Sequence, residues 1–430
     1  MSTPITVEQA REAALAMVAP LGAERVALTE ALGRVLAADA RSDIDVAPFD
    51  NSAMDGFAVR AADLASATAE TPVILEVAAD IPAGAWWDGP LAPGQAARIM
   101  TGAPVPAGAD TVVMVEVTRT VAGDGSIGSR VAFAQVPSEG DHIRRRGEEV
   151  SAGEVVLSAG EVIGPAAIGL LAATGHATVE VFRRPRVAVI STGSELVEVD
   201  VAPGPGKIRN SNSYSLAAQV RAAGGEPLRY PIVHDDVAAI EAAFLRAAEE
   251  ADYIITSGGV SVGDFDFVRP VLERIGKLAF YKVAMRPGAP QTMGRVGDTP
   301  VFGLPGNPTS AYVGFEVFVR PVLRKMQGHT ALERPRVTAR LAHDVRKRAE
   351  KRYYLRARIR PAAGAAAGEG PSAGEAPGLE VELAGSQSSA LLSAAHRGNC
   401  LLVLEAGESH FSAGSLVECM RLDIEEGVVL

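Results

Sequence analysis

The chain has 430 residues, of which 47% are hydrophobic, and a formal net charge of −11. This size and hydrophobic content exclude a small disulfide-stapled scaffold, and at roughly 150 residues per domain they predict about three domains. The excess of acidic residues disfavours a dedicated nucleic-acid coat protein, because binding to phosphate backbones depends on Lys and Arg.

Two sequence features predict a cytoplasmic protein. The only cysteines, Cys400 and Cys419, are too few for a disulfide framework and lack the clustered spacing of thiolate metal sites. The N-terminal residues show no basic stretch followed by an apolar run, and no segment reaches the roughly 20 apolar residues of a membrane span. We therefore expect no membrane association and no nucleic-acid partner.

The N-terminal segment predicts two helices and then a loop. Thr6 and Gln9 have the spacing of a capping box, so a helix is expected to about Val18. A second, short helix is expected over 28–37. The extended stretch that follows ends in a polar, Gly-containing run around Asp55, which is typical of a loop.

The middle of the chain changes from a β pattern to an α/β pattern. Short apolar runs separated by Pro and Gly predict a small β domain before residue 140. Beyond Arg186, continuously apolar strands alternate with helices, and the segment 236–250 has its apolar residues at helical spacing. Such alternation is typical of a doubly wound parallel sheet that helices cover on both faces.

The residues beyond Arg334 predict another β domain. Leu355, Ala357 and Ile359 alternate with arginines, which predicts a half-buried strand with a basic outer face. The run 361–378 contains little that could be buried, so we expect an excursion without function. The expected fold class is multidomain α/β plus β, with an irregular discontinuous domain (1–45 and 141–178), an inserted β domain (46–140), a doubly wound α/β domain (179–330) and a C-terminal β domain (331–430).

Common catalytic motifs are mostly missing from the sequence. No Gly-Lys pair has the upstream glycine of a Walker loop and no HExxH pair occurs, which disfavours a nucleoside triphosphatase and the common zinc hydrolases. The run 259–263 does match the G-x-S-x-G nucleophile elbow, around Ser261. An Asp and a His also follow, as Asp344 and His396 or His410. A serine hydrolase stays open, as does the alternative that these glycines only permit a tight turn.

Three polar, Gly-rich loops follow strands of the α/β segment, at 191–195, 257–266 and 303–308. Because the carboxyl ends of parallel strands meet at one edge of a sheet, we expect these loops to lie together, where doubly wound sheets bind ligands. Their backbone N–H groups and hydroxyls would form a cradle for a polyanion. The residues expected to bind it are Ser191, Thr192, Gly193, Ser257, Gly258, Gly259, Ser261, Pro305 and Asn307.

Charged residues complete this predicted site. Lys282 and Arg286 lie on a strand that would end between the loops, where they would supply positive charge. Hard oxygen ligands for a divalent cation bridging phosphates are expected from Glu195, Asp235, Asp264 and Asp266. A single carboxylate more often caps a helix or forms a surface salt bridge, so only their grouping indicates a site.

Five longer motifs are spread along the chain: Phe49–Arg60, Arg98–Ala103, Arg144–Glu148, Ser257–Gly263 and Gly303–Pro308. In these motifs the chain closely resembles the molybdopterin molybdenumtransferases, the family that includes MoeA and the C-terminal part of gephyrin. The resemblance extends from the first helix to the last β domain, and the motifs are too long to match by chance.

The resemblance implies insertion of molybdate into the dithiolene of adenylylated molybdopterin, with Mg²⁺-dependent release of AMP. Molybdate is a dianion and the pterin carries a phosphate, so fixed donors and a few cations fit both substrates. The family's catalytic positions match Asp55, Thr101, Glu195, Asp235 and Asp266, and its metal positions match the four carboxylates of this set. Lys282 and Arg286 fall where the family has basic residues.

The resemblance also implies partners. In this family the loop that matches Asp55 completes the pocket of a second subunit, which implies a homodimer, and a molybdopterin adenylyltransferase is a further candidate partner. The chain departs from the family at Arg286 and Ala289, where Lys is usual, and at Glu149 and Ser194. Two alternatives therefore remain: a non-catalytic scaffold that binds molybdopterin, and a paralogue that uses tungstate.

Overall fold

The computed structural model describes residues 4–259, 268–362 and 378–427. The chain divides into two compact units, of which unit 1 comprises 1–24 with 181–430 and unit 2 comprises 25–180. None of the helices in the described ranges combines the length and the hydrophobicity of a membrane span.

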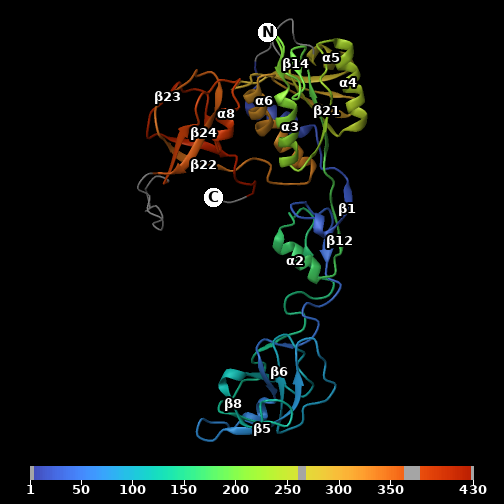
Figure 1. Ribbon diagram of the computed structural model, residues 1–430, viewed down its shortest axis with the longest axis vertical. Coiled ribbons are helices and arrows are strands. Elements are labelled where there is room, and N and C mark those ends of the chain that lie inside the picture. The colour runs from blue at the N-terminus through green and yellow to red at the C-terminus, as the bar shows by residue number, and fades with distance from the viewer. Residues whose placement is uncertain (1–3, 260–267, 363–377, 428–430) are drawn as a thin grey trace. The chain divides into compact units, whose positions relative to one another are not determined.

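The α/β part of unit 1 is built on a six-stranded sheet of order β16-β13-β17-β21-β20-β18, in which the first four strands are parallel. These strands are β13 (Arg186–Ser191), β16 (Glu226–Arg229), β17 (Tyr253–Ser257), β18 (Gly276–Lys282), β20 (Pro290–Val296) and β21 (Thr299–Leu304). Helices α3 (Ser211–Ala222) and α6 (Pro308–Gly314) pack on one face, and α4 (Val237–Glu250) and α5 (Val268–Ile275) on the other (Figure 1). The predicted doubly wound sheet is confirmed.

The C-terminal part of unit 1 is a second six-stranded sheet. Its strands are β19 (Met285–Arg286), β22 (Arg336–Leu341), β24 (Arg352–Pro361), β25 (Leu379–Leu383), β26 (Cys400–Leu404) and β28 (Leu416–Arg421). Pairing of β24 with both β25 and β26 closes five of these strands into a barrel. Strand β19 follows β18 in the chain and pairs with β24, which connects the barrel to the α/β part.

The prediction that β24 has a basic, exposed outer face is wrong for the first half of the strand. Arg356 is only 1% exposed, whereas Arg358 and Arg360 are exposed as expected. The segment after β25 folds over this half of the strand. Its Gln387 Oε1 accepts a hydrogen bond from the Arg356 N–H at 2.9 Å. Both faces of the strand are therefore covered around Arg356.

Unit 2 contains a six-stranded β domain of order β7-β4-β6-β5-β9-β8. Its strands are β4 (Gly56–Val59), β5 (Val73–Ile81), β6 (Gln95–Ile99), β7 (Thr111–Met114), β8 (Thr118–Ala122) and β9 (Arg130–Phe133). The flanking segments pair with each other, β2 (Ala40–Arg41) with β11 (Val155–Leu157) and β1 (Ala23–Ala27) with β12 (Thr178–Phe182), beside helix α2 (Pro165–Ala173). The proposed domain boundaries stay predictions.

The N-terminal helix is confirmed as α1 (Val7–Ala16), with both hydrogen bonds of the capping box between Thr6 and Gln9. The second predicted helix, over 28–37, is wrong, because only one 3₁₀ turn forms, η1 (Leu28–Glu30). Gly33 has a left-handed φ of 74°, and the Leu36 N–H bonds to the carbonyl of Glu161 instead of a helical partner. Tertiary pairing overrides helix propensity here.

A buried group of charged side chains lies where α7 (Arg320–Met326) meets the C-terminal segment. Within it, Arg324 Nη2 lies 3.3 Å from His329 Nδ1. Burial, together with the charge of Arg324, lowers the pKa of His329 to about 4.

His329 should make the protein less stable in mild acid. The unfolded chain takes up a proton near pH 6.5 and the folded chain only near pH 4, so the free energy of unfolding should fall by up to about 3 kcal/mol between these values. His329→Gln should flatten this dependence in urea titrations at pH 7 and 4.5. Equal losses in both proteins would contradict the assignment.

Candidate functional site

The three predicted loops meet at one edge of the α/β sheet. Ser191 at the end of β13 pairs with Ser257 at the end of β17, and Ser257 pairs with Leu304 at the end of β21. The loops therefore leave three neighbouring parallel strands side by side, as expected for a ligand site in a doubly wound sheet.

These loops enclose a cavity of about 620 Å³, which we call the loop cavity. The sequence-predicted residues that line it are Ser191, Thr192, Gly193, Glu195, Asp235, Ser257, Gly258, Gly259, Pro305 and Asn307. Lys282 is not among its lining residues, and Arg286 lines a second cavity instead. Ser261, Asp264 and Asp266 lie outside the described residues.

In the loop cavity, most of the donors and acceptors that are free to bind a ligand belong to side chains and not to the backbone. The N–H groups of Thr192, Gly193 and Gly258 bond to carbonyl oxygens of Ser257, Val233 and Leu304, so the expected backbone cradle is largely used by the protein itself. In contrast, Ser191 Oγ, Thr192 Oγ1 and Asn212 Oδ1 are buried and have no hydrogen-bond partner among the described residues. Unpartnered buried polar atoms are costly, which indicates that a polar ligand completes them.

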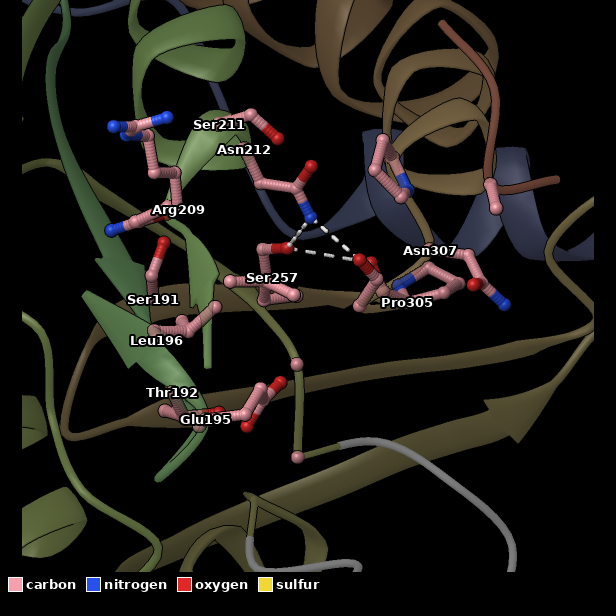
Figure 2. Close-up of a pocket in the computed structure, with 18 of the residues that line it drawn as sticks. Ser191, Thr192, Glu195, Leu196, Arg209, Ser211, Asn212, Ser257, Pro305 and Asn307 are labelled. Atoms are coloured by element: carbon pink, nitrogen blue, oxygen red, sulfur yellow. Dashed lines mark hydrogen bonds between the residues drawn. The ribbon is translucent and has the colours of Figure 1, made fainter. Parts of the chain in front are cut away.

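Asn212 connects two of the loops and was missed in the sequence. Its Nδ2 donates to Ser257 Oγ at 2.6 Å and to the Gly306 carbonyl at 2.8 Å (Figure 2). Asn212 lies in the first turn of α3, whose N-cap is Asn210. The polar run 209–212 before an apolar helix is the signal that could have found it, although such a run usually indicates only a helix cap.

The two acidic residues of the loop cavity also shape its loops. Asp235 Oδ2 accepts a hydrogen bond from the Ser194 N–H at 2.9 Å. The Glu195 carboxylate lies so close over Gly193 that a Cβ there would be 2.6 Å from Oε2. Among the described residues no three acidic, His or Cys side chains are grouped for a metal ion. Two carboxylates still fit Mg²⁺, which keeps several waters and takes further ligands from substrate phosphates.

The second cavity, of about 630 Å³, lies between the α/β part and the barrel of unit 1, and we call it the cationic cavity. Pro290, Pro305 and Asn307 line both cavities, so the two adjoin. Its charged lining residues are Arg286, Arg346, Lys347, Arg348 and Arg356, with Asp344 as the acidic exception. This local positive charge stands out in a chain of net charge −11.

Arg356 is the most unusual of these cations. Its Nη2 donates to the Ser388 carbonyl at 3.2 Å, but its buried Nε has no partner in the part of the chain that the structure describes. Burial lowers the pKa of Arg356 to about 10, so the side chain remains protonated at neutral pH. A buried guanidinium without a carboxylate is costly, which indicates that an anion from solution pairs with it.

In unit 2, Asp55 and Thr101 are brought together. Asp55 Oδ1 accepts hydrogen bonds from both the N–H and the hydroxyl of Thr101, each at 2.7 Å. These bonds lower the pKa of the Asp55 carboxyl, and both residues are exposed. Nearby in sequence, Asp50 forms a salt bridge with Arg145 at 2.7 Å. This pair connects the motif Phe49–Arg60 to the motif Arg144–Glu148.

Gly258 should tolerate no side chain. Its φ is 97°, and a Cβ would lie 2.3 Å from the Thr192 carbonyl oxygen. Gly258→Ala should therefore displace the loop and lower the free energy of unfolding by about 1–3 kcal/mol, measured by urea unfolding. Gly306→Ala is the matched control, because a Cβ there has only an ordinary contact at 3.6 Å. Similar losses for both variants would contradict this account.

Family comparisons cover nearly the whole chain. Residues 5–175 match the MoeA N-terminal region (domain I and II), 188–325 a probable molybdopterin binding domain, and 338–422 the MoeA C-terminal region (domain IV). The molybdopterin biosynthesis MoeA protein of Pyrococcus horikoshii has a similar crystal structure, with a TM-score of 0.79 and 28% identity over 97% of this chain and all of that one.

Several relatives carry the same name. Molybdopterin molybdenumtransferase 2 of Mycobacterium tuberculosis is 48% identical over 81% of this chain and 86% of its own length. The molybdopterin molybdenumtransferase of Haemophilus influenzae is 37% identical over 96% of this chain and 97% of its own. The chain therefore belongs to the MoeA family of molybdopterin molybdenumtransferases.

Proposed function

We propose that this chain inserts molybdate into adenylyl-molybdopterin and releases AMP, with the two substrates in the two adjoining cavities of unit 1. The observation that carries this proposal is the shared wall of Pro290, Pro305 and Asn307 between a hydroxyl-lined and a cationic cavity. A phosphorylated pterin fits the first cavity and a small oxyanion fits the second. Because the two cavities adjoin, substrates bound in them would have their reacting groups close together.

The chain's own residues act in binding and orientation. The hydroxyls of Ser191 and Thr192 would donate to phosphate oxygens of the substrate, and Asn212 Oδ1 would accept from one of its N–H or O–H groups. Arg356 would hold the oxyanion by charge-assisted hydrogen bonds. Arg286 and Arg348 add charge to the same cavity.

Mg²⁺ is part of the proposal. Glu195 and Asp235 would hold it, with Asp266 as a further predicted ligand outside the described residues. When bound, the ion would offset negative charge on the adenylyl phosphate. A reducing cytoplasm is the proposed compartment.

The experiment that tests the function is release of AMP from adenylyl-molybdopterin, with and without Mg²⁺ and with molybdate or tungstate. We expect release that needs Mg²⁺ and molybdate and falls sharply in Asp55→Asn. Tight binding without release would favour the scaffold alternative. Faster release with tungstate than with molybdate would favour the tungstate paralogue.

We also propose a homodimer in which the Asp55–Thr101 pair of one subunit serves the loop cavity of its partner, as the family resemblance implies. Asp55→Asn and Asp235→Asn should each be inactive. After mixing and subunit exchange, half of the dimers are mixed, and each carries one intact site. Activity should then return to about a quarter of the wild-type value. No recovery despite exchange would contradict a shared site.

A further inference from the structure

A short apolar ledge lines part of the loop cavity, beside polar residues (Figure 2). It consists of Leu196 and Ile208, which lie in register in the parallel strand pair β14 (Leu196–Val197) and β15 (Ile208–Arg209). Residues in register project to the same face, and both line the cavity. Ile208 is 56% exposed. A large aliphatic side chain that is exposed and lines a cavity beside hydroxyls and carboxylates offers an apolar surface to part of a ligand.

The ledge is held in place by hydrogen bonds on several sides. The Ile208 N–H donates to the Glu195 carbonyl at 2.9 Å, and Lys207 Nζ donates to the Ser194 carbonyl at 2.6 Å. The exposed position of Ile208 is therefore fixed by its backbone and by the preceding side chain. A fixed surface binds a rigid ligand at a low cost in conformational entropy.

The outer end of the strand pair is fixed as well. Glu198 pairs with Arg229 at 3.2 Å and accepts a hydrogen bond from the Tyr214 hydroxyl at 3.2 Å. The Arg229 guanidinium in turn lies 4.2 Å from the centre of the Tyr214 ring. These contacts join the residue after β14 to helix α3 and strand β16.

We propose that Ile208, supported by Leu196, binds a planar heterocycle of the substrate and so determines which end of the molecule enters this side of the cavity. The proposal rests on the proposed function, because the substrate there carries two such rings, a pterin and an adenine, with phosphates between them. The phosphates would contact the hydroxyls of Ser191 and Thr192, and one ring would lie flat on the ledge. Ile208 is then a specificity residue, without a role in the chemical step.

The test is Ile208→Ala, with Val201→Ala as the matched control. Val201 lies in the connection between β14 and β15 and is 47% exposed, but it does not line the cavity. Ile208→Ala should weaken binding of adenylyl-molybdopterin about five- to tenfold by loss of apolar contact, and should leave the maximal rate of AMP release unchanged. Val201→Ala should change neither quantity.

Smaller probes identify the ring. If adenine lies on the ledge, Ile208→Ala weakens AMP binding and leaves ribose 5-phosphate binding unchanged, whereas a pterin on the ledge leaves AMP binding unchanged. Affinity for adenylyl-molybdopterin within twofold of wild type would overturn the proposal. Wild-type chain that binds this compound without molybdate-dependent AMP release would overturn the proposed function alone.

Discussion

Replacing Arg356 by Met is expected to weaken molybdate binding about 100-fold while leaving the fold as stable as before, or more stable. The variant loses a buried cation whose Nε has no partner among the described residues, and breaking an ionic contact between such a cation and a ligand costs about 2–5 kcal/mol. Burial is the cause of the lowered pKa of Arg356, so the folded chain bears a desolvation cost that Met removes at similar volume. Calorimetric titration with molybdate and thermal unfolding measure the two effects.

Arg358→Met is the control for this prediction. Arg358 lies on the same strand β24 but is exposed, so its loss should change neither molybdate binding nor the unfolding midpoint by a measurable amount. If Arg356→Met binds molybdate as tightly as the wild type, the assignment of the oxyanion to the cationic cavity is wrong. A strong loss of stability would instead assign Arg356 a structural role through its bond to Ser388.

The loop cavity could be predicted because each of its loops is recognised from neighbouring residues in the sequence. Each Gly-rich loop directly follows an apolar strand, and the rule that parallel strands end at one edge brings the loops together without any knowledge of distant contacts. Asn212 was missed because it lies inside a helix that the sequence presents as an ordinary capped helix. The free hydroxyls of Ser191 and Thr192 could be named from the sequence, but the use of the neighbouring N–H groups by the protein could not.

The cationic cavity was not predictable in the same way. Alternation along β24 assumes that one face of a strand meets solvent, whereas closure of the barrel and the segment around Gln387 cover both faces at Arg356. Such covering depends on residues about 30 positions away in the chain. Arg286 was predicted for the loop cavity, but its strand β19 pairs with β24, which directs it to the cationic cavity. Lys282 lies on β18, an edge strand that β20 separates from β21.

Replacing Glu426 by Gln is expected to lower the free energy of unfolding by about 3 kcal/mol or more. The Glu426 side chain is 0% exposed and contacts Arg320, with Arg324 at 3.3 Å and Arg334 at 3.7 Å. Arg320 lies in α7 and Arg334 in the connection to the barrel, so this carboxylate fastens the C-terminal segment to both. Its removal leaves Arg320 and Arg324 without this counter-charge, whereas Arg334 keeps Glu316 at 3.1 Å. An uncompensated buried charge costs far more than the loss of one hydrogen bond.

Glu418→Gln provides the comparison, because Glu418 pairs with Arg336 at 2.8 Å but is 54% exposed. An exposed pair of this kind contributes at most about 1 kcal/mol. Urea unfolding at pH 7 should therefore separate the two variants clearly. The arginines also lower the pKa of Glu426, so its stabilising contribution is complete above the carboxyl's unfolded pKa and is lost as the pH falls through the folded value. The difference between wild type and Glu426→Gln should shrink in acid, and a difference that stays constant down to pH 3 would show that charge is not its cause.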